Sequence, residues 1–175
     1  MPIFRRSLNP SGDLTRYRKV MSPPFSQDRQ PVWSALDGVD DVVSFARTAG
    51  KNGRPRMLVV DGDDGPRASV RIVFRHRFDV LAVDSSPLAL AACELRCFDV
   101  AISDFRRAGI SGLDCLEEMR RMGCGAPVIF LTAYATRDRI RRAFALGAYD
   151  VIDKPFSVLE LQQAVAMAMG MEFAE

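Results

Sequence analysis

Polar side chains that could handle phosphate follow several short apolar runs of this sequence. They are Asp61 and Asp63 after residues 57–60, Asp104 after 100–103, Thr132 after 128–131, and Lys154 shortly after 149–152. Carboxylates that are crowded together repel one another and attract a hard divalent cation such as Mg²⁺. A lysine and a threonine hydroxyl beside them can hold phosphoryl oxygens, and a carboxylate in that setting can act as a nucleophile. Brought together, these residues could bind Mg²⁺ and take up a phosphoryl group.

The spacing of apolar residues after position 55 predicts elements that would bring them together. It predicts five short strands, at 57–60, 80–83, 100–103, 128–131 and 149–152, which alternate with five helices, at 66–77, 86–96, 111–122, 136–146 and 157–170. Such alternation implies a doubly wound parallel sheet with helices on both faces. Ligands of such sheets bind beyond the carboxyl ends of the strands. We therefore expect the five polar residues to share one sheet edge.

Each of these residues also has a purely structural interpretation. An aspartate after a strand commonly caps a helix or a turn, and threonine favours strands. A lysine before proline is usually solvated, as Lys154 before Pro155 could be. The occurrence of all five at strand ends, in this order, favours a common site.

The first part of the chain has a different composition. Residues 1–30 hold six basic and two acidic side chains, and five of the ten prolines lie within residues 1–31. We interpret 1–31 as a disordered basic tail, most simply a solubilising one. Apolar residues at helical spacing then predict a possible amphipathic helix over 32–46, followed by a glycine-containing linker to residue 54.

Composition excludes several classes of protein. The 175 residues carry a net charge of only +2, which does not indicate a nucleic-acid binder. Because no apolar run is longer than six residues and the N-terminus lacks an apolar core, we expect no membrane span and no signal peptide, and a cytoplasmic protein. The four cysteines do not have zinc-site spacing, and we interpret Cys93 and Cys97 as small core residues.

Longer motifs carry a resemblance to a known family. Leu58-Val59-Val60-Asp61, Ile102-Ser103-Asp104 with Gly109-Ile110-Ser111-Gly112, Leu131-Thr132-Ala133, and Gly147-Ala148 with Asp153-Lys154-Pro155-Phe156 stand in that order. From about residue 55 to 171 the chain resembles a bacterial two-component response-regulator receiver domain. The resemblance implies a flavodoxin-like (βα)5 fold.

The resemblance also implies roles for the polar residues. Asp104 resembles the aspartate that accepts a phosphoryl group from a histidine kinase or a phosphotransfer protein. Thr132 and Lys154 resemble the hydroxyl and the ammonium that contact the phosphoryl group. Asp61, Asp104 and the backbone carbonyl of Arg106 match positions that bind Mg²⁺ in the family. The domain would then be a phosphorylated signalling protein and not an enzyme.

Three positions depart from the family pattern. Gly62 replaces a second acidic residue that normally contacts the metal, and Asp63 is shifted from it by one residue, so we expect a weakened Mg²⁺ site. Ala108 replaces a usual proline. Val151 replaces a switch aromatic, and Tyr149 lies two positions away, so the usual coupling between threonine and aromatic is not expected to operate.

We expect the output to be a protein contact. The chain ends shortly after the last predicted helix and shows no helix-turn-helix or zinc-finger pattern, which predicts a stand-alone receiver without a DNA-binding domain. The helix at 136–146 is rich in arginine, and the helix at 157–170 has more apolar residues than one face can bury. A homodimer through these two helices could cover the surplus, or the segment 33–46 could fold back over the last helix.

Two alternatives stay open. A degenerate receiver, locked in one state, would act only as a binding or dimerisation module, which Gly62 and Val151 favour. A haloacid-dehalogenase-like phosphatase would use Asp61-Gly62-Asp63, although its expected following residues and its late acidic pair are missing.

Overall fold

The computed structural model describes residues 32–50, 52–105 and 111–171. From Trp33 onward these residues belong to one compact unit. The predicted disordered tail at 1–31, together with Arg106 and Ala108, lies outside the described residues. Of the helices that are described, none has the length and apolar character needed to cross a membrane.

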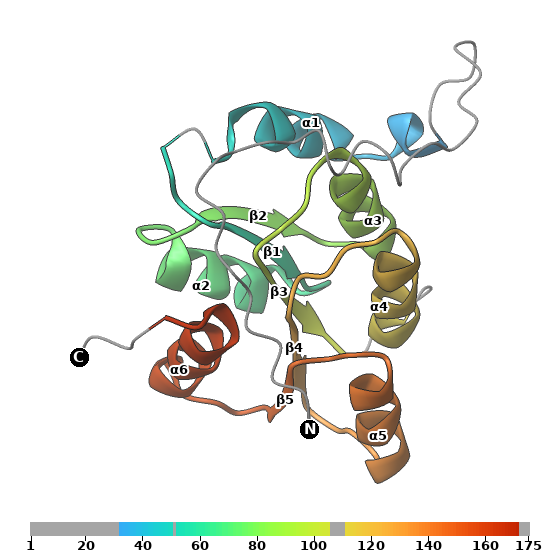
Figure 1. Cartoon of the computed structure of the whole chain (residues 1–175), viewed down its shortest axis with the longest axis vertical. Helices are drawn as coiled ribbons and strands as arrows, with labels where there is room; N and C mark the ends of the chain where they lie inside the picture. The colour runs from blue at the N-terminus through green and yellow to red at the C-terminus, as the bar shows by residue number, and fades with distance from the viewer. Residues whose placement is uncertain (1–31, 51, 106–110, 172–175) are drawn as a thin grey trace. The chain divides into compact units, whose positions relative to one another are not determined.

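Five parallel strands form the sheet, in the order β2-β1-β3-β4-β5 (Figure 1). The strands are β1 (Arg56–Val60), β2 (Asp79–Val83), β3 (Val100–Asp104), β4 (Val128–Thr132) and β5 (Asp150–Asp153). Each matches one of the predicted runs to within two residues at either end. The prediction of a doubly wound five-stranded parallel sheet is confirmed. Short apolar strands separated by helices have few other ways to be buried on both faces.

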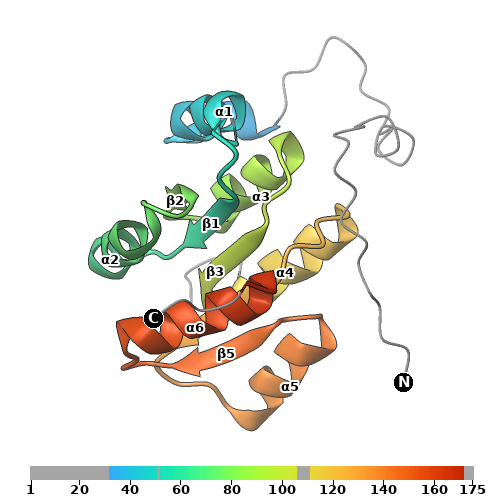
Figure 2. The ribbon, with the colours of Figure 1, turned by 60° about the vertical axis from the view of Figure 1, so that its left-hand side comes forward.

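Helices cover both faces of this sheet. They are α1 (Val39–Thr48), α2 (Asp64–Phe74), α3 (Ser86–Leu95), α4 (Gly112–Arg121), α5 (Arg137–Ala145) and α6 (Val158–Met169), with a short 3₁₀ turn at Val32–Ala35. Helices α2 and α6 lie on one face of the sheet, and α3, α4 and α5 lie on the other (Figure 2). In β1, Met57 and Val59 pack into the apolar layer under α2 and α6, whereas Leu58 and Val60 pack into the layer under α3, α4 and α5. This alternation follows from the two-residue period of a strand.

The helices that follow β3, β4 and β5 begin at a hydroxyl cap. Ser111, Thr136 and Ser157 each accept a hydrogen bond from the backbone N–H three residues later. At Ser157 the backbone N–H of the cap donates in turn to the Glu160 carboxylate, which completes a capping box. Such a cap stabilises a helix by about 1 kcal/mol. It also fixes where the chain leaves each strand end.

In α5, Ala143 is fully buried while its neighbour Phe144 is exposed. Consecutive helical residues point about 100° apart, so only one of the two can face the sheet. The prediction that Cys97 is a core residue is wrong. Cys97 is exposed because α3 ends at Leu95, before the next turn can carry Cys97 inward.

Cys93, in contrast, is buried as predicted, and it lies against Cys124. A hydrogen bond between these two thiols lowers the pKa of Cys124 to about 6, with help from the nearby Arg120 guanidinium. The same bond and burial raise the pKa of Cys93. Among the described residues, no group of three or more cysteine, histidine or acidic side chains is placed to hold a metal ion.

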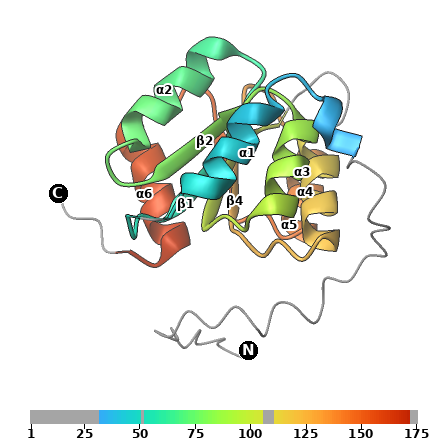
Figure 3. The same ribbon diagram turned by 90° about the horizontal axis from the view of Figure 1, so that it is seen from above.

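The predicted helix at 32–46 is interrupted, and it does not dock on the last helix. Gly38 adopts φ 83°, a left-handed conformation that separates the turn Val32–Ala35 from α1. Helix α1 lies along α3 (Figure 3), with Phe45 stacked on Phe98 at 5.8 Å between ring centroids. Arg96 Nε also donates to the Ala46 carbonyl at 2.8 Å. The alternative in which this segment covers the last helix is therefore wrong.

The surplus apolar residues of α6 are in large part exposed, as predicted. Leu161 and Val165 are buried against the sheet, while Met167 is 69% exposed and Leu159 and Met171 are also exposed. Ala166 is buried, so part of the second apolar face is covered.

We predict that α1 contributes to the stability of the whole unit. Val42 of α1 is fully buried in the same apolar layer as α3 and α4. Val42→Ala is expected to lower the free energy of unfolding by about 2 kcal/mol, because it removes two buried methyl groups and leaves a cavity. Urea unfolding followed by circular dichroism measures this change. Ser44→Ala, at an exposed position of α1, is the control and should not destabilise the protein. A Val42→Ala curve that matches wild type would mean that α1 is not docked in solution.

Candidate functional site

The carboxyl ends of β1 and β3 lie side by side, and this adjacency brings two acidic residues together. Val60 pairs in register with Ser103, so the next residues, Asp61 and Asp104, leave the sheet next to each other. The strand order reverses direction between β1 and β3, which makes this the topological switch point where ligands of such sheets bind. The acidic pair therefore occupies the expected position.

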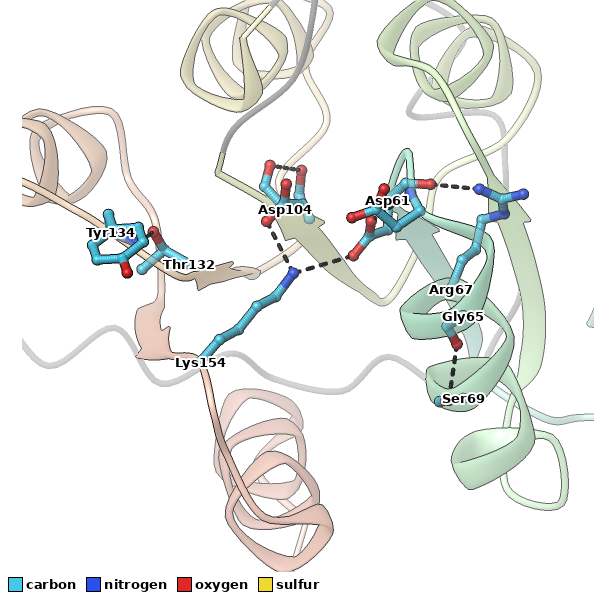
Figure 4. A network of polar contacts seen from close by, with 10 residues as sticks. Asp61, Gly65, Arg67, Ser69, Asp104, Thr132, Tyr134 and Lys154 are labelled. Atoms are coloured by element: carbon cyan, nitrogen blue, oxygen red, sulfur yellow. Dashed lines mark hydrogen bonds and ion pairs between the residues drawn. The ribbon is translucent and has the colours of Figure 1, made fainter.

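Lys154 joins the two carboxylates. Its Nζ lies 3.2 Å from Asp104 Oδ1 and 3.5 Å from Asp61 Oδ2 (Figure 4). The side chain comes from the end of β5 and is 24% exposed, against 5% for Asp61 and 15% for Asp104. Because few water molecules can reach these groups, the single ammonium offsets much of the repulsion between the two carboxylates.

Asp61 is held from several sides. Its Oδ1 accepts a hydrogen bond from the Asp63 backbone N–H at 2.9 Å, while its Oδ2 faces Lys154. Arg67 Nη1 donates to the Asp61 carbonyl at 2.7 Å and also pairs with Asp64. Asp61 is only 4% exposed. The cost of burying its carboxylate is offset because both carboxylate oxygens have partners.

Thr132 ends β4 beside these groups. Asp104 pairs in register with Leu131, so Thr132 lies one residue further toward the open edge. The Thr132 residue is fully buried, and its Oγ1 accepts the Tyr134 N–H at 3.2 Å. Its carbonyl accepts the Lys154 N–H at 2.6 Å, which ties the end of β5 to the end of β4. The hydroxyl and the ammonium are thus fixed by the same short segment.

The oxygen donors fit a hard cation, but they are few. Asp61 and Asp104 supply two carboxylates, and Gly62 supplies none. Asp63 contributes its backbone N–H to Asp61, while its own side chain is exposed. Arg106 lies outside the described residues. An all-oxygen set of this kind suits Mg²⁺.

The residues at the predicted switch positions lie on β5 and just before it. Val151 is half-buried, pairs in register with Phe130 and packs into the layer under α4 and α5. Tyr149 is 40% exposed and lies just before β5. The position of the family's aromatic is thus filled by a smaller side chain that is already partly in the core.

Three residues of the site were not singled out from the sequence. Arg67 binds the Asp61 carbonyl, and Arg139 Nη2 donates to the Phe105 carbonyl at 3.4 Å from above the Phe105 ring. Gly112 packs so closely that a Cβ there would lie 2.6 Å from the Asp104 carbonyl oxygen. Gly112 belongs to the motif Gly109-Ile110-Ser111-Gly112, and Arg139 belongs to the arginine-rich helix predicted at 136–146. Their roles at the site become visible only from their contacts in the structure.

The fold and the site together define a doubly wound α/β domain with an acidic pocket, bridged by lysine, at its switch point. A family model described as the response regulator receiver domain matches residues 57–166. The chain therefore belongs to the response regulator receiver domain family, whose members take part in two-component signalling.

Individual relatives agree with this assignment. The regulatory protein AtoC of Escherichia coli K12 is 31% identical over 118 residues, which cover 67% of this chain and 26% of AtoC. The transcriptional activator protein PfeR of Pseudomonas aeruginosa is 37% identical over 109 residues, or 61% of this chain and 35% of PfeR. The chain thus spans about a quarter to a third of the length of these two relatives.

Solved structures support the fold. A CheY-like response regulator receiver domain protein from Methanospirillum hungatei JF-1 superposes with a TM-score of 0.64 at 23% identity, over 67% of this chain and 94% of that one. The receiver domain of a sensor histidine kinase from Pseudomonas aeruginosa PAO1, with magnesium coordinated in its active-site cleft, gives 0.61 at 24% identity, over 67% and 98%.

We predict that Gly112 is required for the geometry around Asp104. Gly112→Ala is expected to cost about 1–3 kcal/mol of folding free energy, because the new methyl group overlaps the Asp104 carbonyl and the Phe130 ring. Gly65→Ala, where a Cβ would meet nothing within 4 Å, is the matched control in α2. The control should unfold at equal or higher denaturant concentration than wild type, since alanine favours helices. Two coincident unfolding curves for the variants would contradict the prediction.

Proposed function

We propose that Asp104 accepts a phosphoryl group from a phosphohistidine of a histidine kinase or phosphotransfer protein, and that the chain signals by protein contact. The observation that supports this most directly is the position of Lys154, whose ammonium lies 3.2 Å from the Asp104 carboxylate. An ammonium at this distance neutralises charge that develops on transferred phosphoryl oxygens. Membership of the receiver family supports the same residue as acceptor.

In the proposed reaction one Asp104 carboxylate oxygen attacks phosphorus. A P–O bond forms while the P–N bond to the donor imidazole breaks, and the electron pair leaves with the imidazole nitrogen. The product is an acyl phosphate on Asp104. Lys154 pairs with the new phosphoryl oxygens, and the Thr132 hydroxyl rotates from accepting the Tyr134 N–H to donating to one of them.

Mg²⁺ is the proposed cofactor. Asp61, Asp104 and the backbone carbonyl of Arg106 would hold it, and when bound it supplies positive charge beside the phosphoryl oxygens. The Pseudomonas receiver domain with magnesium in its cleft supports the choice of metal. Because Gly62 leaves the set one carboxylate short, we propose a weakened site.

The proposed output is a contact with another protein. Two exposed aromatic residues are Phe144 of α5 and Tyr149 just before β5. Helix α6 exposes Leu159 and Met167. A homodimer through α5 and α6 would cover this apolar surface. The degenerate receiver is the second candidate, since Gly62 and the half-buried Val151 both remove features that phosphorylation normally uses.

We predict a single phosphoryl adduct on Asp104. Incubation with Mg²⁺ and acetyl phosphate is expected to raise the intact mass by one phosphoryl group, because the carboxylate can displace acetate at phosphorus as it displaces imidazole. Asp104→Asn should give no adduct, because the amide is a poor nucleophile, and Asp63→Asn should still give one. Intact-mass spectrometry reads all three.

The other outcomes are equally informative. A folded wild-type protein without an adduct would contradict phosphoryl acceptance and favour the degenerate binding module. Hydrolysis of a generic phosphate ester that is lost in Asp61→Asn and kept in Asp104→Asn would favour the phosphatase instead.

We further predict that Gly62→Asp strengthens Mg²⁺ binding by roughly tenfold or more, since ligand charge sets the affinity for hard cations. Gly62 is exposed and does not have a positive φ, so aspartate fits its backbone. Calorimetric titration with Mg²⁺ measures the change, and Gly65→Asp in α2 is the control for added charge elsewhere. Equal affinities for Gly62→Asp and wild type would show that Gly62 is not what limits the metal site.

A further inference from the structure

A second concave site lies at the other end of the strands from Asp104. A shallow cavity of about 330 Å³, open to solvent, lies between the end of α1, residues Asn52 and Arg54 before β1, the last turn of α2 and the start of β2. Phe45, Asn52 and Arg54 contribute to its wall and precede residue 57, where the match to the receiver family begins. The cavity is thus built between the family domain and the segment that precedes it in this chain.

The wall of this cavity is basic. Arg54, Arg71 and Arg75 line it together with a single carboxylate, Asp79. That carboxylate already has partners, since its Oδ2 accepts the Gly50 N–H at 2.7 Å and its Oδ1 lies 3.5 Å from Arg54 Nε. Three guanidinium groups around one occupied carboxylate leave an excess of positive charge.

Arg54 is held in place by a hydrogen bond, whereas Arg71 and Arg75 are not paired with a carboxylate among the described residues. Arg54 Nη1 donates to the Arg75 carbonyl at 3.1 Å, which connects the β1 approach with the end of α2. Arg71 and Arg75 are four residues apart and share one face of α2. Within the described part of the chain, no ion pair joins either of them to a carboxylate.

Size and chemistry select the ligand. Guanidinium groups bind phosphate oxygens in a two-pronged geometry. The volume of about 330 Å³, open to solvent on one side, leaves room for more than one phosphate group. Phe45 forms the accessible apolar part of the wall and stacks on Phe98, while Phe78 lies beneath the wall and is buried against Phe74. A linked pair of phosphoryl groups would use both the charge and the volume.

We propose that this cavity binds a pyrophosphate group, either free or as part of a nucleoside diphosphate. The phosphoryl oxygens lie against Arg54, Arg71 and Arg75. In the nucleoside diphosphate the sugar and base extend along Phe45. Since the ligand contacts both the α1 connection and α2, it stabilises the docking of α1. The site uses neither Asp104 nor Lys154, so it is independent of the proposed phosphoryl acceptance.

The test is calorimetric titration of the full chain with sodium pyrophosphate and, separately, with ADP. Chelator and no added Mg²⁺ keep the Asp104 site out of the measurement. Arg71→Ala is expected to weaken binding about tenfold, the loss of one charge-assisted contact. Arg77→Ala is the matched control, because Arg77 is exposed nearby but does not line the cavity. Asp104→Asn should bind as wild type does.

The arms separate the sources of the pyrophosphate group. Tighter binding of ADP than of pyrophosphate identifies a nucleoside diphosphate, and the reverse identifies free pyrophosphate. The proposal is overturned if neither pyrophosphate nor ADP binds. It is also overturned by equal losses in Arg71→Ala and Arg77→Ala, or by citrate binding as tightly as pyrophosphate, which would indicate general attraction of anions. Circular dichroism confirms that Arg71→Ala is folded.

Discussion

Two largely shielded carboxylates on neighbouring strands repel each other, and Lys154 supplies the counter-charge that offsets this repulsion. Asp61 and Asp104 follow β1 and β3 at the point where the strand order reverses, so the topology forces them together. The ammonium reaches both from beyond β4. This reach requires β5 to end level with β4, which the bond from the Lys154 N–H to the Thr132 carbonyl secures.

The surrounding structure maintains that arrangement at the backbone level. Ser111, Thr136 and Ser157 start the helices that follow β3, β4 and β5, so the chain leaves each strand end in a fixed direction. Gly112 lets α4 begin against the Asp104 carbonyl, where any side chain would clash. Arg67 binds the backbone of Asp61 without using its carboxylate. Apart from Asp61 Oδ1, which accepts the Asp63 N–H, the side-chain oxygens of the acidic pair are therefore left for Lys154 and for a ligand.

Features set by neighbouring residues could be predicted from the sequence, whereas contacts between residues that only the fold brings together could not. Strands were predictable because a doubly covered strand needs a continuous apolar run, and the polar residue after each run then marked the site. Contacts set by three-dimensional approach were not predictable, as at Gly112 and Arg67. The amphipathic pattern of α1 showed that it has a buried face, but pattern alone could not tell α3 from α6 as its partner. Likewise, Arg54 pairs with Asp79, which lies far from it in the sequence.

The charge balance of the pocket bears on why Gly62 can be tolerated. Asp61, Asp104 and Lys154 leave one net negative charge, which attracts a dication only weakly. In the proposed product the Asp104 carboxylate has become an acyl phosphate dianion, so Asp61, Lys154 and the phosphoryl group together carry two negative charges. A bound Mg²⁺ makes that product state neutral, whereas a second acidic residue at position 62 would leave it negative. Under the proposed reaction the pocket is therefore better matched to a metal after phosphoryl transfer than before it, and the proposed loss of affinity from the missing carboxylate applies mainly where no phosphoryl group is present.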